Sequence, residues 1–424
     1  MFFKKLKESP LYYWEEKSYV MAITDGKDDD NLLKNALSRI DKSKEIKVIE
    51  SNPDFSTQTI MFKVEYKRVT YEVGMYVGGV SVPEYYLNNL YLSDEEKKAL
   101  LDAKKCITIF MSFDDNPKVC FHLQIKIANL LVPDMLALLD ESAERIFVSD
   151  WVKLTASSKY TPSSKDLFSV QAVNGEDGSV WLHTHGLSRC GITELEILGS
   201  HSEVSRNHYN LINSYAMYLI DKTEEHLGGD YIGRLINGMP IVATCVSWVD
   251  ALKYYKNIKN GGKDDRKNGH NSRSSVIFLY TSEENENNNV YSKVSEFDSL
   301  WGDNPLFFIS DEETNRMKNV AVERFEYVKK AHKDKKNTIL LKIGLPLEEK
   351  GKYEHIWFEL IEFKKDKFKA KLTQEPYYVN DIHEGDEKWF TVDDLTDWII
   401  YTSQSSITPD SAYMLDKRVF NEER

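Results

Sequence analysis

The stretch Val180-Trp181-Leu182-His183-Thr184-His185-Gly186, followed shortly by Glu194-Leu195-Glu196-Ile197, is the most informative part of the chain. Side chains two positions apart on a β-strand point to the same face of the sheet. His183 and His185 therefore share a face if this segment is a strand, and Glu194 and Glu196 share one on the next strand. The pattern predicts two strands joined by a turn, with four polar side chains that are able to converge.

Composition restricts the class of protein. The 424 residues are enough for two or three domains of ordinary size, each with its own hydrophobic core. The net charge of −13, from 68 acidic and 55 basic side chains, gives a field that repels nucleic acid and anionic lipid. No apolar run reaches the roughly 20 residues that cross a bilayer, and residues 1–10 do not resemble a secretory signal. We therefore expect a cytoplasmic protein that binds neither nucleic acid nor membrane.

The four cysteines are far apart and form no CxxC pair, so they predict neither a disulfide framework nor a zinc ribbon. They are Cys106, Cys120, Cys190 and Cys245. Cys190 lies close in sequence to the two histidines, which permits a Cys-His nucleophile. A buried structural thiol is the alternative that the composition favours.

Hydrophobic periodicity predicts an α+β fold with a boundary near residue 310. Residues 1–309 are expected to form a layered antiparallel or mixed sheet with helices on one face, either as one domain or as two sub-domains, 1–150 and 151–309. One long apolar helix is predicted over 118–139, kinked or split at Pro133. Residues 253–273 are rich in Lys, Asn and Gly and predict a solvated loop. Residues 310–424 predict a helix and then a small, curved antiparallel sheet.

The last quarter of the chain resembles the YegJ-like bacterial domain of unknown function, the family numbered two-three-one-four. The residues that carry the resemblance are Glu354-His355-Ile356-Trp357, Lys371-Leu372, Glu375-Pro376, Gly385-Asp386 and Asp397-Trp398. Their order and spacing are specific together, although each is common alone. Gln374 stands where relatives usually have Asn.

The first three quarters resemble a second uncharacterised bacterial family, numbered four-zero-two-six, which is typically fused to that C-terminal domain. The resemblance rests on Trp181 to Leu187 and Glu194 to Ile197. Other bacterial proteins share a looser pattern that Thr184, Gly186, Gly191, Glu194 and Glu196 fit, although their histidines vary. Neither resemblance implies an activity.

Spacing also suggests a metal site. The zinc motif of JAMM-type isopeptidases has HxHP followed by a Ser and an Asp, and a similar spacing occurs here in His183, His185, Thr193 and Glu196. Three identities differ, because Gly186 replaces the proline, Thr193 the serine and Glu196 the aspartate. Two imidazoles and one carboxylate would leave an open zinc position for a water that hydrolyses an amide or ester. The alternative is that His183 and His185 only satisfy hydrogen bonds within the sheet.

A second candidate site lies in the C-terminal module. Glu354, His355, Trp357, Asp397 and Trp398 are able to line a groove for a peptide or small ligand, or else to close the small sheet as core anchors. No Walker, GxGxxG or GxSxG motif occurs, and no catalytic residue is assigned. The 24 tyrosines favour a non-catalytic module that binds a protein or peptide and needs no cofactor. A metal-dependent hydrolase with zinc at His183, His185 and Glu196 is the alternative.

Overall fold

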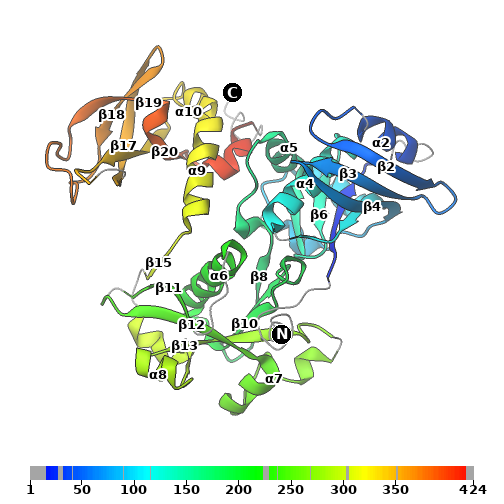
Figure 1. Cartoon of the computed structure of the whole chain (residues 1–424), viewed down its shortest axis with the longest axis horizontal. Coiled ribbons are helices and arrows are strands. Elements are labelled where there is room, and N and C mark those ends of the chain that lie inside the picture. The colour runs from blue at the N-terminus through cyan, green and yellow to red at the C-terminus, as the bar shows by residue number, and fades with distance from the viewer. Residues whose placement is uncertain are drawn as a thin grey trace. The chain divides into compact units, whose positions relative to one another are not determined.

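A computed structural model describes residues 16–26, 32–40, 42–88, 90–114, 116–222, 229–235, 237–267, 269–301, 305–349 and 352–416. The chain divides into two compact units (Figure 1). The first comprises residues 1–152 and 163–310, and the second comprises residues 153–162 and 311–424. The α+β class predicted from the sequence is confirmed.

The N-terminal half of the first unit is built on an antiparallel sheet in the order β2-β3-β4-β5-β1-β6-β7. The strands are β1 (Ser18–Ile23), β2 (Lys47–Asp54), β3 (Thr59–Tyr66), β4 (Val69–Gly79), β5 (Lys105–Met111), β6 (Ala137–Asp140) and β7 (Arg145–Val148). The helices are α2 (Leu32–Ile40), α3 (Asp94–Asp102) and α4 (Pro117–Leu131). The buried helix α4 packs on β5, the central strand of the sheet, and on its neighbour β1.

The prediction of one helix over 118–139 is wrong beyond Leu131. Helix α4 ends there, two residues before Pro133, whose ring also disfavours the helical conformation of the residue before it. The apolar segment after the proline forms β6, which pairs with β1 and β7. A short apolar run carries no periodicity that separates a buried strand from a buried helix, so pairing decides its structure.

The second half of the same unit contains a mixed sheet in the order β15-β11-β12-β13-β10-β9-β8, with β14 beside β13. Its strands are β8 (Ser169–Asn174), β9 (Ser179–His185), β10 (Glu194–His201), β11 (Asp230–Arg234), β12 (Pro240–Ser247), β13 (Ser274–Tyr280), β14 (Ser292–Lys293) and β15 (Leu306–Phe307). Only the β10–β13 pair is parallel among those described. Helix α6 (Ser205–Asp221) packs on β9 and β10 through an apolar face that includes Leu211, Ile212 and Tyr215.

The second unit contains an antiparallel sheet in the order β19-β18-β17-β16-β20-β21. The strands are β16 (Thr338–Pro346), β17 (Tyr353–Lys364), β18 (Lys367–Leu372), β19 (Glu387–Thr391), β20 (Leu395–Tyr401) and β21 (Ser406–Ile407). Helices α9 (Asp311–Glu323) and α10 (Phe325–Ala331) lie against β20. Trp398, Phe358 and Phe368 are fully buried and form the centre of its core.

In the described part of the chain, no helix combines the length and the apolarity that a membrane crossing requires.

Candidate metal centre

The two histidines of the opening motif lie where the sequence predicts them, on one face of β9. This strand pairs antiparallel with β10 on one side and with β8 on the other. His183 is fully buried and His185 is 8% exposed. The intervening Thr184 points to the opposite face, where its Oγ1 donates to the Glu194 carboxylate at 2.7 Å. The strand period of two therefore places both imidazoles together.

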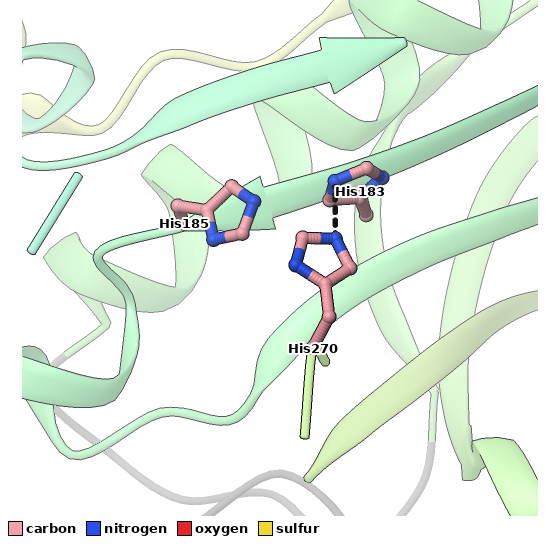
Figure 2. Close-up of side chains that lie close together, drawn as sticks. All are labelled: His183, His185 and His270. Atoms are coloured by element: carbon pink, nitrogen blue, oxygen red, sulfur yellow. Dashed lines mark hydrogen bonds between the residues drawn. The ribbon is translucent and has the colours of Figure 1, made fainter. Parts of the chain in front are cut away.

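A third histidine, His270, completes the cluster. Its Nε2 lies 3.1 Å from the Nε2 of His183, although 87 residues separate the two. One ring nitrogen from each of His183, His185 and His270 lies within 4.8 Å of the others. Figure 2 shows His183 and His185 projecting from β9 and His270 reaching them from a separate segment. The three rings form the compact group expected around a single ion.

Sequence reasoning missed His270 because it lies in the segment 253–273, which was predicted to be only a solvated loop. A single histidine between Gly269 and Asn271 has no spacing to another ligand that a linear motif detects. Only the sheet, which pairs β10 with β13 in parallel, brings the residues before Ser274 close to β9.

Burial favours the uncharged form of His183 and His185. It lowers the pKa of His183 to about 3, and the neighbouring His185 and His270 act in the same direction. Burial also lowers the pKa of His185, although the nearby carboxylate of Glu144 opposes this effect. Neutral imidazole has the free lone pair that a metal requires.

Two ring nitrogens of the cluster are buried without a hydrogen-bond partner, namely His183 Nδ1 and His185 Nε2. A buried polar atom left unpaired costs about 1–3 kcal/mol, so such atoms call for an explanation. A metal ion bound to His185 Nε2 would remove one of these costs. The other nitrogen of that ring, Nδ1, lies 3.5 Å from Glu144 Oε1. Carboxylates often orient metal-bound histidines in this way.

Glu144 is itself held in place. It lies in the turn between β6 and β7, in a left-handed backbone conformation with φ of 48°. Gln171 of β8 donates to its second carboxylate oxygen at 2.9 Å. Non-glycine residues in this conformation often occur at functional sites.

The structure does not bring Glu196 into the group of three ligand atoms. Glu196 lies opposite His183 on β10, but its carboxylate is buried and faces Arg266. Arg266 donates to both carboxylate oxygens at 2.6 Å, and Trp181 Nε1 donates at 3.0 Å. His270 stands in the place that the sequence analysis gave to Glu196. A role of Glu196 as a metal ligand therefore stays a prediction that this geometry does not favour.

The other glutamate of the motif, Glu194, shapes the turn after β9. Its carboxylate accepts hydrogen bonds from Thr184 Oγ1, Gly186 N and Ser188 N at 2.7, 2.9 and 3.0 Å. Burial raises its pKa despite these bonds. Glu194 therefore acts as a buried support of the turn.

An open pocket of about 880 Å3 lies beside the histidines, and His185 and His270 form part of its wall. Glu144 and Glu141 line it on the side of the first sheet, and Lys17 and Arg273 add positive charge. An ion bound by the three imidazoles would therefore be accessible to a small molecule.

The spacing of one pair of nitrogens matches a zinc ion. Two imidazole nitrogens bound to one tetrahedral zinc ion at 2.0–2.1 Å lie about 3.3 Å apart, close to the observed 3.1 Å between His183 and His270. Three histidines leave a fourth position open for water or substrate, as in catalytic zinc sites.

Three family models match the chain. They are Protein of unknown function (DUF4026) N-terminal over residues 18–162, Protein of unknown function (DUF4026) C-terminal over residues 170–278, and Uncharacterized protein conserved in bacteria (DUF2314) over residues 307–424. The chain belongs to the DUF4026 family, with a C-terminal DUF2314 domain. Both resemblances stated from the sequence are thereby confirmed. No curated protein and no solved structure matches the chain.

All three histidines lie in the part matched by the C-terminal DUF4026 model, whereas Glu144 lies in the part matched by the N-terminal model. Cys190 also lies in the part matched by the C-terminal DUF4026 model, and burial raises the pKa of its thiol to about 12. A thiol in this state is a poor nucleophile, which agrees with a structural role.

In the DUF2314 domain, the five residues of the second candidate site do not all lie together. His355 and Trp357 alternate with buried residues on β17. Asp397 of β20 lies opposite Lys342 of β16 in the strand register. Trp398 is fully buried, and its indole Nε1 donates to Ala321 O at 3.0 Å.

The fifth residue, Glu354, is also buried and accepts hydrogen bonds from the backbone N–H groups of Tyr377, Tyr378 and Val379. The structure therefore does not bring the five residues to one face of the sheet, and a shared ligand groove stays a prediction.

Proposed function

We propose that this protein binds one transition-metal ion of the zinc class through His183, His185 and His270, and that the ion activates water for hydrolysis. The observation that carries the proposal is the convergence of three imidazole nitrogens within 4.8 Å at the wall of an open pocket. Imidazole is a preferred ligand of zinc and of neighbouring divalent metals. The buried and unpaired His185 Nε2 supports an ion at this position.

The chemistry follows from three neutral ligands and one open position. His183, His185 and His270 would hold the ion, and a water molecule at the open position would lose a proton near pH 7. Such a site would supply hydroxide for the hydrolysis of an ester or amide. The water would then be divided between the acid and the protonated leaving group, an alcohol or amine.

The test is the metal content of the untagged protein, measured by elemental analysis and by zinc titration against a chromogenic chelator. We expect one equivalent in the wild type and none in a His183→Ala/His185→Ala/His270→Ala variant. The matched control is His208→Ala, which removes a buried histidine of the same sheet region that pairs with Ser200 and Asp298 instead. This control should keep its zinc. Folded wild-type protein that binds no divalent metal would refute the proposal.

A non-catalytic interaction role, predicted from the sequence, is the second candidate, and one feature of the DUF2314 domain favours it. Tyr377 and Tyr378 are 83% and 74% exposed. The Glu354 carboxylate holds their backbone through the hydrogen bonds described above, so both rings are presented on a fixed segment. Exposed aromatic side chains on a fixed backbone are common contact points for proteins and peptides.

This second candidate is tested with a photo-crosslinking amino acid in place of Tyr377, in the cells that make the protein. We expect one discrete adduct with a protein partner, which a Tyr378→Ser substitution abolishes. The control carries the crosslinker at Tyr85, an exposed tyrosine of the other unit. The same adducts from both positions would count against a specific surface.

A further inference from the structure

We propose that Glu196 and Arg266 are positioning residues of the metal centre, whose buried ion pair fixes the loop that presents His270. This inference rests on the proposed metal site and assigns a role to two residues that are not in the group of ligand atoms. It also explains why a glutamate lies opposite His183 without joining the cluster of histidines.

The ion pair is the central contact. Arg266 Nη1 and Nη2 each lie 2.6 Å from one oxygen of the Glu196 carboxylate, and both side chains are almost fully buried. Such a two-point contact fixes orientation as well as distance, because the guanidinium and the carboxylate are both planar. The side chain of Arg266 therefore has one position relative to β10.

Arg266 also binds the backbone of its own loop at both ends. Its Nη2 donates to Gly261 O at 2.9 Å, and its Nη1 donates to Asn271 O at 2.8 Å. Asn271 directly follows His270 in the chain. The guanidinium thus ties the residue next to the third histidine to the carboxylate on β10.

Two tryptophans enclose the guanidinium. Its central carbon lies 4.5 Å from the ring of Trp248 and 5.2 Å from the ring of Trp181. Trp181 Nε1 donates to Glu196, and Trp248 Nε1 donates at 3.0 Å to Ser272 O, two residues after His270. Cation–π contacts are stronger away from water, so this enclosure strengthens the anchor.

The composition of the loop makes this anchor important. The loop contains Gly261 and Gly269 in left-handed conformations, and it is rich in lysine and asparagine. A chain of this composition gains little from apolar packing and has large conformational freedom when released. Loss of the Glu196 charge should therefore let His270 move away from His183 and His185, and the metal should keep two protein ligands.

The experiment compares zinc affinity in wild type, Glu196→Gln and Arg266→Lys, by chelator competition on the full chain. Each variant should bind zinc about 10–100-fold more weakly, the usual effect of losing a group that orients a ligand. In cobalt-loaded protein, the visible absorption of a tetrahedral site should weaken. The matched control is Asp230→Asn, which breaks another buried contact of this sheet, to Lys222 at 2.7 Å, and should leave zinc affinity unchanged.

A double variant separates positioning from general destabilisation. In a His270→Ala background, Glu196→Gln should change zinc affinity less than twofold, because the ligand that it positions is already absent. An equal loss in both backgrounds would overturn the inference, as would wild-type affinity in Glu196→Gln and Arg266→Lys. The two variants remove different partners, so one is informative if the other fails to fold. Absence of zinc from the wild type would overturn the proposed function, and with it this inference.

Discussion

At the scale of single residues, His183 should make stability depend on pH. Its pKa is lowered to about 3 in the folded protein, from an ordinary value near 6.5. Between these values the unfolded chain binds a proton that the folded protein does not, so acid favours unfolding. We expect the free energy of unfolding of metal-free protein to fall below pH 6.5, by up to about 1.4 kcal/mol per pH unit from this residue. Denaturant titrations at pH 7.0, 6.0 and 5.0 measure the slope.

The matched variant is His183→Gln, which keeps a polar side chain and cannot gain a charge. The difference between wild type and variant isolates His183 from the other titrating groups. Parallel curves for the two proteins between pH 7 and 5 would contradict a depressed pKa.

Glu144 allows a second prediction at this scale. Glu144→Gln should weaken zinc binding about 10–100-fold, because a neutral amide attracts His185 Nδ1, 3.5 Å away, less strongly than the carboxylate does. Glu141→Gln is the control, since Glu141 lines the same pocket but is not among the partners of His185. The measurement is chelator competition at constant pH. Equal affinity of the two variants would show that Glu144 does not orient His185.

At the scale of elements, the turn between β9 and β10 depends on Gly186. Its φ is 108°, and an added Cβ would lie 2.6 Å from Leu167 O and 3.0 Å from the Cβ of Ala143. Gly186→Ala should therefore lower the free energy of unfolding by about 2–4 kcal/mol, the sum of backbone strain and a backbone clash. Gly238→Ala is the control, because Gly238 has a φ of 84° but open space around it.

The control should cost about 1–2 kcal/mol, from strain alone. The difference between the two glycine variants in urea unfolding measures how closely Leu167 and Ala143 approach the turn. Equal losses would mean that the neighbouring backbone moves aside without cost.

The elements also show what sequence reasoning is able to predict. Period-two alternation placed His183 and His185 on one strand face, because that pattern is local. It failed for 137–140, where strand pairing and not periodicity decides between a helix and β6. The sequence analysis named Glu196 as the third candidate ligand and did not consider His270, for a related reason. The arginine that binds the Glu196 carboxylate, Arg266, lies in the same loop as His270. The composition of that loop predicts only a solvated segment.

At the scale of the whole molecule, each of the two compact units is built from two stretches that are separate in the sequence. The sequence predicted a C-terminal module from residue 310, and the second compact unit takes residues 311–424 together with 153–162. Within that unit Leu154 packs on the core around Phe358, and the Glu323 carboxylate accepts hydrogen bonds from Ser158 Oγ at 2.7 Å and Lys159 N at 2.9 Å. No composition shift marks so short a segment, because its role depends on contacts that are about 165 residues away.

This arrangement predicts that residues 311–424 alone are less stable than the same unit in the full chain. Glu323→Ala tests the cause: it should lower the stability of the unit by about 1–3 kcal/mol in the full chain, since hydrogen bonds to a charged group are lost. In the isolated fragment, which lacks Ser158 and Lys159, the same change should have almost no effect. Glu326→Ala is the control, because its exposed pair with Lys329 should contribute at most about 0.5 kcal/mol in either background. Hydrogen exchange of strand β16, followed by mass spectrometry, reports the unit separately in both proteins. An equal effect of Glu323→Ala in fragment and full chain would mean that residues 153–162 do not support this fold.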